Sequence, residues 1–77
     1  MNKVMFFAHL RDKVGKECLL IEASGKTVAE LKAEITKEYS LDKMDTVMTA
    51  INEEFAGNEE IIQDEDVIAF IPPVSGG

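Results

Sequence analysis

The pair Gly76-Gly77 at the end of the sequence contains the residues whose type and spacing most directly suggest chemistry. Glycine lacks a Cβ atom, so two in a row form the narrowest possible backbone and can enter a slot that excludes any side chain. A terminal carboxylate is ionised at neutral pH, and it is a poor electrophile until it is activated, most simply as an acyl-adenylate. We therefore predict that the carboxyl group of Gly77 reacts, and that a partner enzyme activates it with ATP.

The residues before the glycine pair form a stiff, uncharged stem. Pro72 and Pro73 fix φ and lack N–H donors, and consecutive prolines favour an extended polyproline II conformation. Val74 and Ser75 carry this stem to the glycines without adding charge. The sequence therefore predicts a folded domain over residues 1–71 and an extended tail over residues 72–77. A frayed terminus without chemical function is the alternative.

The rest of the sequence offers little catalytic equipment. Cys18, the single cysteine, lies in an apolar run, which favours a packed thiol over a reactive one. His9 is the single histidine, whereas a metal site needs three or four ligands. The run Gly25-Lys26-Thr27 imitates the end of a phosphate-binding loop, but Leu20 stands where that motif requires a glycine. We predict no metal site, no cofactor bound by the chain itself, and no catalytic activity without partners.

Length and charge narrow the class of protein further. A chain of 77 residues forms one domain, and its fifteen acidic and eight basic residues give a formal net charge of −7. This charge disfavours nucleic acid as a partner and suits either a basic docking surface or solubility alone. One cysteine excludes an intramolecular disulfide and fits a reducing cytoplasm. No apolar stretch approaches the length of a membrane span, so we expect a cytoplasmic protein with no membrane partner.

Hydrophobic periodicity predicts an α+β domain with one main helix and a mixed sheet of four to five strands. The helix is expected over residues 28–39, because Thr27 and Glu30 have the spacing of a capping box. Residues 11–16 are expected to form a turn or a single helical turn. Strands are expected over residues 4–10, 17–22, 47–52 and 67–71, with a short strand at 55–56. The first two should form a hairpin, and the last, apolar on both faces, should be central.

Side-chain alternation in the first strand singles out one aromatic residue. It places Phe7 with Met5 and His9 on one face of the sheet, opposite Phe6 and its neighbours Val4 and Ala8. The face that carries the histidine is the more exposed one in this interpretation. An exposed Phe7 indicates a docking patch, and a Phe7 buried at the end of the sheet is the alternative.

Four segments of the chain resemble the small subunit of molybdopterin synthase, a family of sulfur carriers. They are residues 4–11 (VMFFAHLR), the helix start Thr27-Val28-x-x-Leu31, residues 50–54 (AINEE) and residues 67–77 (VIAFIPPVSGG). The resemblance implies the β-grasp fold of ubiquitin. One departure is clear: the family usually has an Asp-Gly-Asp turn before the last strand, and Glu65 here replaces the glycine that would favour a positive φ.

The resemblance also implies a function and partners. An adenylyltransferase related to ubiquitin-activating enzymes would adenylate Gly77, and a sulfur-donating enzyme would supply the sulfur of a thiocarboxylate. The tail would insert into the large synthase subunit, within a heterotetramer, and give that sulfur to cyclic pyranopterin monophosphate. We expect a docking patch near the root of the tail, formed by Phe7, Phe55 and Ile71 with Arg11 at its edge. A thiamine-type sulfur carrier, a ubiquitin-like modifier joined to lysines through Gly77, and a plain interaction domain are the alternatives.

Overall fold

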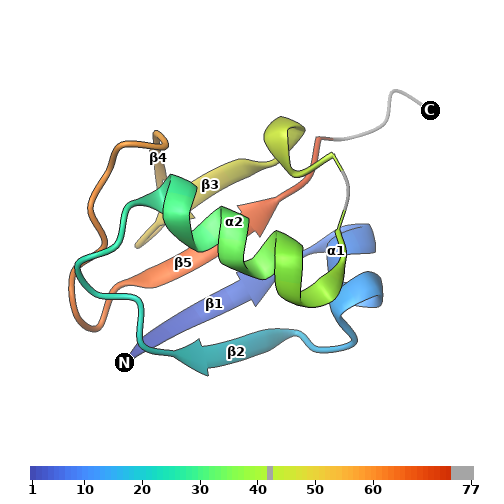
Figure 1. Ribbon diagram of the computed structural model, residues 1–77, viewed down its shortest axis with the longest axis horizontal. Helices are drawn as coiled ribbons and strands as arrows, with labels where there is room; N and C mark the ends of the chain where they lie inside the picture. The colour runs from blue at the N-terminus through green and yellow to red at the C-terminus, as the bar shows by residue number, and fades with distance from the viewer. Residues whose placement is uncertain (42, 74–77) are drawn as a thin grey trace.

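The computed structural model describes residues 1–41 and 43–73, so most of the predicted tail, residues 74–77, lies outside the described part. The chain forms a five-stranded sheet crossed on one face by a long helix (Figure 1). In chain order the elements are β1 (Asn2–Phe6), α1 (Ala8–Val14), β2 (Cys18–Ile21), α2 (Val28–Tyr39), the 3-10 helix η1 (Met44–Thr46), β3 (Met48–Ile51), β4 (Glu54–Ala56) and β5 (Val67–Ile71).

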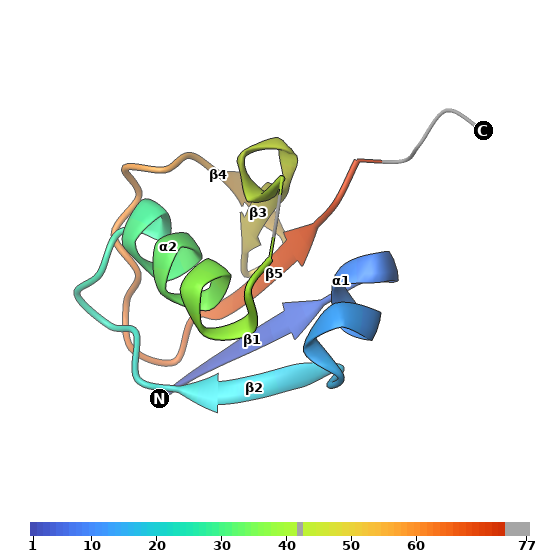
Figure 2. The same ribbon diagram turned by 45° about the vertical axis from the view of Figure 1, so that its right-hand side comes forward.

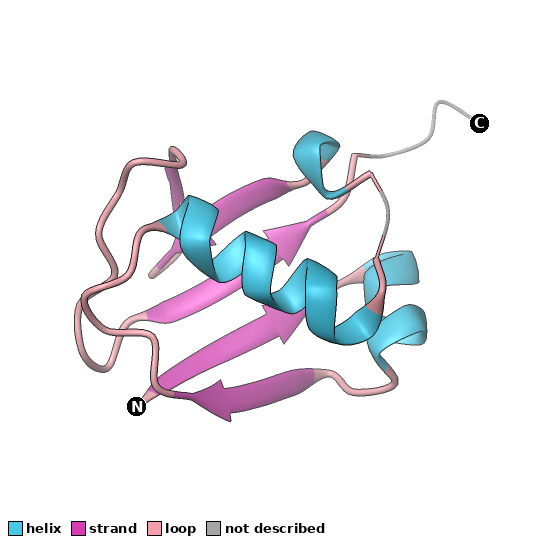
Figure 3. Ribbon diagram, viewed as in Figure 1, coloured by secondary structure: helices cyan, strands magenta, loops and turns pink. Residues whose placement is uncertain are grey.

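The strands lie in the order β2-β1-β5-β3-β4 (Figure 3). β1 pairs antiparallel with β2, as predicted for the first hairpin, and parallel with β5. β3 pairs antiparallel with both β4 and β5, so the sheet is mixed and β5 is central, as predicted. This α+β arrangement, with one long helix packed over the sheet, is the β-grasp architecture that the resemblance implies.

α2 has the bounds that the sequence predicts, and its first turn shows why. The Thr27 side chain accepts a hydrogen bond from the Glu30 backbone N–H at 3.2 Å, and the Glu30 carboxylate accepts one from the Thr27 N–H at 2.9 Å. This reciprocal capping satisfies two N–H groups that the helix start leaves unpaired. Leu31 and Ile35 lie one turn apart and are buried, so they direct the helix onto the sheet (Figure 2).

The core lies between α2 and one face of the two central strands. Alternate residues of these strands are 0–2% exposed, and they are Val4 and Phe6 on β1 with Ile68 and Phe70 on β5. The rings of Phe6 and Phe70 have centroids 6.2 Å apart, within the range of favourable aromatic pairs. Burying such side chains supplies most of the stability that a domain of this size has.

The predicted strand over residues 4–10 is wrong beyond Phe6. The chain leaves the sheet at Phe7, Ala8 adopts a positive φ of 54°, and α1 begins there. Leu10 is buried on the inner side of α1, and the helix ends at Gly15, whose φ is 82°. Of the two alternatives for residues 11–16, a turn or a single helical turn, the helical one is nearer, because residues 11–14 form the second half of α1. Face alternation holds as far as Phe7 and fails for the two residues after it, which are exposed in α1.

Two turns at the far end of the sheet use positive φ without glycine. Asn52 and Glu53, at φ 51° and 71°, reverse the chain between β3 and β4. Glu65, in the turn before β5, has φ 70°, so it keeps the conformation that the family's glycine would favour. The Asn52 side chain joins the two turns, because it donates to the Asp66 carboxylate at 2.8 Å and accepts from the Val67 N–H at 3.0 Å.

Candidate docking face and carrier tail

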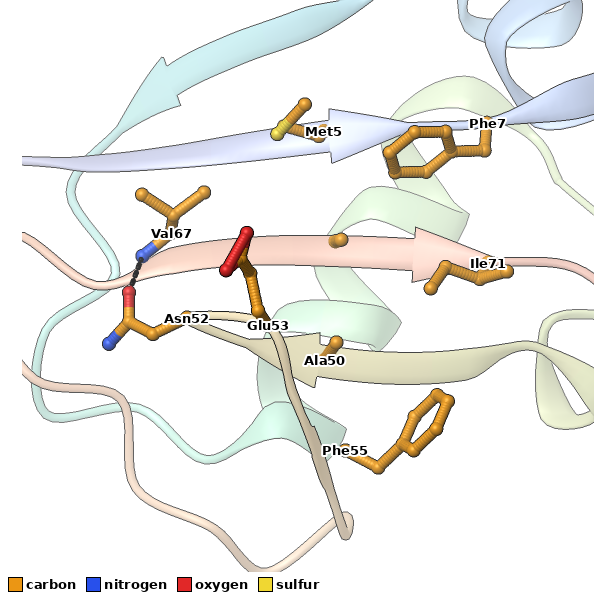
Figure 4. Close-up of a pocket in the computed structure, with 9 residues that line it drawn as sticks. Met5, Phe7, Ala50, Asn52, Glu53, Phe55, Val67 and Ile71 are labelled. Atoms are coloured by element: carbon orange, nitrogen blue, oxygen red, sulfur yellow. Dashed lines mark hydrogen bonds between the residues drawn. The ribbon is translucent and has the colours of Figure 1, made fainter.

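The face of the sheet opposite α2 carries a shallow hollow of about 570 Å³ (Figure 4). We call the apolar side chains that line it the open face, and they come from all strands except β2. They are Met5, Phe7, Ala50, Phe55, Val67, Ala69 and Ile71. Asn52 and Glu53 border the hollow at the turn between β3 and β4.

Strand register explains the hollow shape. Met5, Ala69, Ala50 and Phe55 lie opposite one another across β1, β5, β3 and β4. Small alanine side chains thus occupy β5 and β3, and the larger side chains of Met5 and Phe55 rise on either side of them, on β1 and β4. Figure 4 shows Phe7 on one side of the hollow and Phe55 on the other, with the end of β5 between them. The result is an apolar trough with aromatic walls.

The walls of the trough are accessible. Phe55 is 71% exposed and Phe7 is 39% exposed, whereas the core phenylalanines of the same sheet are almost completely buried. Two large aromatic side chains on one side of a small domain are characteristic of a surface that a partner covers. The Asn52 hydrogen bond to Val67 fixes the polar end of the trough, so the surface is built before any partner arrives.

Three of the four residues expected to form a docking patch lie together. Phe7, Phe55 and Ile71 all line the trough. Arg11 does not line it: this residue lies in α1, where its guanidinium Nη1 is 3.8 Å from Oε1 of Glu17, and it borders a separate hollow beside the turn that follows α1. Arg11 lies outside the lining of the trough because the chain forms a helix from Ala8 instead of continuing the strand.

Four apolar residues of the trough were not anticipated from the sequence, and they are Met5, Ala50, Val67 and Ala69. A signal for them is present. Residues 67, 69 and 71 alternate with the buried Ile68 and Phe70, and Met5 precedes Phe7 by two. Alternation alone gives each strand two faces, but the pairing of strands decides which residues meet.

The tail begins at the edge of this trough. Ile71 is the last residue of β5, Pro72 is buried and Pro73 is exposed. Val74, Ser75, Gly76 and Gly77 lie outside the described residues. Six residues follow Ile71, and a fully extended chain spans roughly 3.3–3.6 Å per residue, so a segment of this length can reach at most about 20 Å from the trough. A partner that held the end of the chain would therefore lie close to the open face.

The other candidate groups occupy structural positions. Cys18 is half-buried on β2 beside Met5, and His9 is exposed on α1. Lys26 pairs with Glu34 at 2.6 Å while Thr27 caps α2, which agrees with a turn and a cap rather than a phosphate loop. Across residues 1–41 and 43–73, no cluster of three or more His, Cys, Asp or Glu side chains is suited to hold a metal ion. None of the helices within these residues has the length and apolar character needed to cross a membrane.

The sequence is similar to those of known proteins over nearly the whole length of the chain. The molybdopterin synthase sulfur carrier subunit of Arabidopsis thaliana is 36% identical, and the match covers 97% of this chain and 81% of that protein. The Escherichia coli protein of the same name is 32% identical over the full length of both chains.

Two solved structures extend the likeness to three dimensions. Small archaeal modifier protein 1 from Methanosarcina acetivorans has a TM-score of 0.80 at 29% identity, covering 99% of this chain and 95% of that one. The complex of subunits 1 and 2 of molybdopterin-converting factor from Helicobacter pylori matches at a TM-score of 0.72 and 28% identity, covering 99% and 97%. The ThiS family profile matches residues 4–77, and the two relatives are matched over 81% and 100% of their lengths, so the chain belongs to the ThiS family.

Proposed function

We propose that this protein is the sulfur carrier of a molybdopterin synthase. Its family, and curated relatives named molybdopterin synthase sulfur carrier subunit, support this role. The structural observation that supports the proposal most directly is the open face, which includes Ile71, the residue after which the tail begins. An accessible apolar trough next to a Gly-Gly terminus has the form of a protein that is held by one surface while its end reacts elsewhere.

The chemistry takes place on the carboxyl group of Gly77. A partner adenylyltransferase uses ATP to form the acyl-adenylate and releases pyrophosphate. A sulfur-donating enzyme then displaces AMP, so sulfur replaces one oxygen and a thiocarboxylate forms. Transfer of that sulfur to cyclic pyranopterin monophosphate, with water supplying the replacement oxygen, regenerates the carboxylate, and two such transfers supply the two sulfur atoms of the dithiolene. The chain binds no cofactor in this scheme. It contributes an extended tail that presents Gly77 and a surface that partners recognise, while the partners supply the acid–base and nucleotide chemistry.

The large subunit of the synthase is the partner that we assign to the open face. The Helicobacter pylori structure is a complex of subunits 1 and 2 of molybdopterin-converting factor, and this chain matches it over nearly its full length. In our proposal Phe7, Phe55 and Ile71 contact the large subunit, and Pro72, Pro73, Val74, Ser75 and Gly76 lead the terminal glycine into its active site. Two copies of each subunit would form the heterotetramer in the cytoplasm.

The direct test is reconstitution with the adenylyltransferase, ATP, a sulfur donor and the large subunit. We expect intact-mass analysis to show replacement of one oxygen by sulfur, followed by dithiolene formation. Deletion of Gly77 should abolish both while leaving the fold intact, and Gly76→Val should impair the step that needs a narrow backbone. Cys18→Ser is the matched control, because sulfur travels on Gly77 in this scheme. A folded Cys18→Ser protein without activity would contradict it.

A ubiquitin-like modifier is the second candidate, because the similar Methanosarcina acetivorans structure is named small archaeal modifier protein 1. A modifier would use the same adenylate but would form isopeptide bonds with lysine side chains. Mass spectrometry of protein isolated from its native cell separates the two functions. Thiocarboxylate without lysine adducts supports the carrier, and Gly-Gly adducts on other proteins support the modifier. A thiamine-type carrier would instead restore thiazole synthesis and leave molybdopterin synthesis unchanged.

A further inference from the structure

The two edges of the sheet are protected to different degrees. β4 is an edge strand of three residues that begins with Glu54. β2, at the other edge, reads Cys-Leu-Leu-Ile and contains neither a charge nor a proline. Within residues 1–41 and 43–73, no segment pairs with its outer side. Leu20, in the middle of this strand, is 69% exposed. Edge strands usually carry a charge, a proline or a bulge that prevents further pairing, so β2 is an unguarded edge.

The unpaired backbone groups of β2 can be identified from its pairing with β1. The Phe6 N–H donates to the Glu17 carbonyl at 3.0 Å, so residue 17 directs its polar backbone groups toward β1. In an antiparallel pair this direction alternates along the strand. Leu19 therefore also faces β1, whereas Cys18 and Leu20 direct their N–H and C=O groups outward. These two residues present the free donors and acceptors of the edge.

We infer that two copies of this protein associate through β2, in an antiparallel pair that extends the sheet from one copy into the other. For hydrogen bonds to form between the copies, residues whose backbone N–H and C=O groups point outward must lie opposite one another. A register that places Cys18 opposite Leu19 of the second copy is therefore excluded, because the backbone groups of Leu19 point toward β1. Among the allowed registers, the one centred on Leu19 places Cys18 opposite Leu20 of the second copy. The strand then pairs with itself, and its apolar edge is covered.

Charge favours the same register. When Leu19 lies opposite its own counterpart, Lys16, two residues before β2, comes close to Glu22, the residue after β2, in the second copy, and two such pairs form because the arrangement is symmetric. Centring on Leu20 instead places Lys16 opposite Ser24 and forms no ion pair. An unrelated peptide does not share this complementarity, so a second copy is the occupant that β2 itself specifies. Phe55 lies on the opposite edge strand, away from the contact, so the pairing does not occupy that wall of the trough.

The pairing predicts a concentration-dependent dimer. Sedimentation equilibrium over about 10 µM to about 1 mM should show a mass rising from 8.5 kDa toward twice that value. Leu20→Lys, which adds the missing edge charge at an exposed position, should weaken association by about tenfold or more. Lys16→Glu should weaken it as well, and the double exchange with Glu22→Lys should restore it. Lys37→Glu makes the same charge change on α2 and should have no effect. Urea unfolding checks that each variant is folded.

A cross-link tests the register. Opposed residues that are not hydrogen-bonded have Cα atoms about 4.5 Å apart, which is within the range of a disulfide. Leu19→Cys in a Cys18→Ser background should therefore form covalent dimers on mild oxidation, and Phe55→Cys in the same background should not. A protein that stays monomeric throughout the series overturns the inference. So does a dimer that survives Leu20→Lys but is lost on Phe55→Lys, because that dimer would use the open face, and so does capture of a partner peptide by β2 without self-association.

Discussion

The two faces of the sheet are built from the same strands and do different work. On β5, Ile68 and Phe70 are completely buried against the side of the sheet that α2 covers, whereas Val67, Ala69 and Ile71 alternate with them on the open side. Strand periodicity of two makes this division possible. One run of five apolar residues therefore supplies both the core and the floor of the trough.

The contrast shows how a domain this small keeps an exposed apolar surface without losing its fold. The covered face uses large side chains that interlock with α2, and the open face has alanines in the centre with aromatic residues at the rim. Both sides are thus lined by apolar side chains, but their burial differs because, among residues 1–41 and 43–73, helices pack on one side alone. Substitutions should therefore separate into those that act on folding and those that act on docking.

The largest effect is expected on the covered face. Phe70→Ala removes a fully buried ring that packs against Phe6, so it should reduce the free energy of unfolding by about 3–5 kcal/mol. A domain of this size has little stability to spare, and much of the variant should be unfolded. Urea denaturation followed by circular dichroism measures the change. A loss below about 1 kcal/mol would mean that the covered face does not hold the fold together.

Replacing the aromatic residues of the open face by alanine should affect binding of the large subunit much more than the free energy of unfolding. Phe55→Ala and Phe7→Ala should each weaken binding of the large subunit by about tenfold or more, if both rings are anchors. At the 71%-exposed Phe55, the free energy of unfolding should change by only about 0.5 kcal/mol. Isothermal titration calorimetry and urea denaturation provide the two measurements.

A control comes from an exposed apolar residue that does not line the trough, although it borders a second hollow that Phe55 also lines. Ile61 is 53% exposed and forms an isolated bridge with Thr27 near the start of α2. Ile61→Ala should leave large-subunit binding unchanged, so a loss there would indicate a general surface effect. If Phe7→Ala lowered the free energy of unfolding but left the dissociation constant unchanged, Phe7 would belong to the core.

Local signals decide which of these features the sequence predicts. The bounds of α2 were predicted to the residue, because Thr27 and Glu30 set its start and Leu31 and Ile35 set its buried side. β5 was placed at the centre because its apolar residues leave no polar face. In both cases the deciding residues lie within a few positions of one another.

The features that were missed depend on distant parts of the chain or on strained backbone. The start and length of α1 are missed, since only a turn or a single helical turn is expected over residues 11–16, because Phe7 continues an apolar run and Ala8 gives no sign of its positive φ. Leu10 and Val14, four residues apart and followed by Gly15, are the signal that could have revealed the helix. The trough joins residues of four strands, so its membership depends on register. Arg11, expected at the edge of the trough, borders a different hollow for another reason, because the chain enters α1 at Ala8 instead of continuing the strand.

A smaller effect is expected at the turn that leads into β5, the strand shared by both faces. Glu65 has φ 70°, a conformation that glycine adopts without steric cost. Glu65→Gly should therefore raise the free energy of unfolding by about 0.5–1 kcal/mol and leave large-subunit binding unchanged. Urea denaturation measures the first quantity and calorimetry the second. Lower stability would mean that the added freedom of the unfolded chain outweighs the relief of strain.

The smallest effect is expected at the start of β1, in a charge cluster that belongs to neither face. The Met1 ammonium donates to Oδ1 of Asp64 at 2.7 Å and lies 3.6 Å from Glu22. The hydrogen bond with Asp64 raises the pKa of the ammonium, and the same bond lowers the pKa of the Asp64 carboxyl group.

Each of these two pKa shifts limits, at one end of the pH range, the contribution of the ion pair to the free energy of unfolding. Because the folded pKa of Asp64 lies below its unfolded value, its contribution is present above about pH 4 and disappears as pH falls through the folded pKa. Because the folded pKa of the Met1 ammonium lies above its unfolded value, the contribution is full below about pH 8 and disappears as pH rises through the folded pKa.

Asp64→Asn should therefore lower the melting temperature slightly between these limits and leave it nearly unchanged outside them. Thermal melts of both proteins across this range provide the measurement, with large-subunit binding at neutral pH as the control. An equal decrease at every pH would mean that Asp64 acts through uncharged contacts, and a loss of binding would mean that this end of the sheet takes part in docking after all.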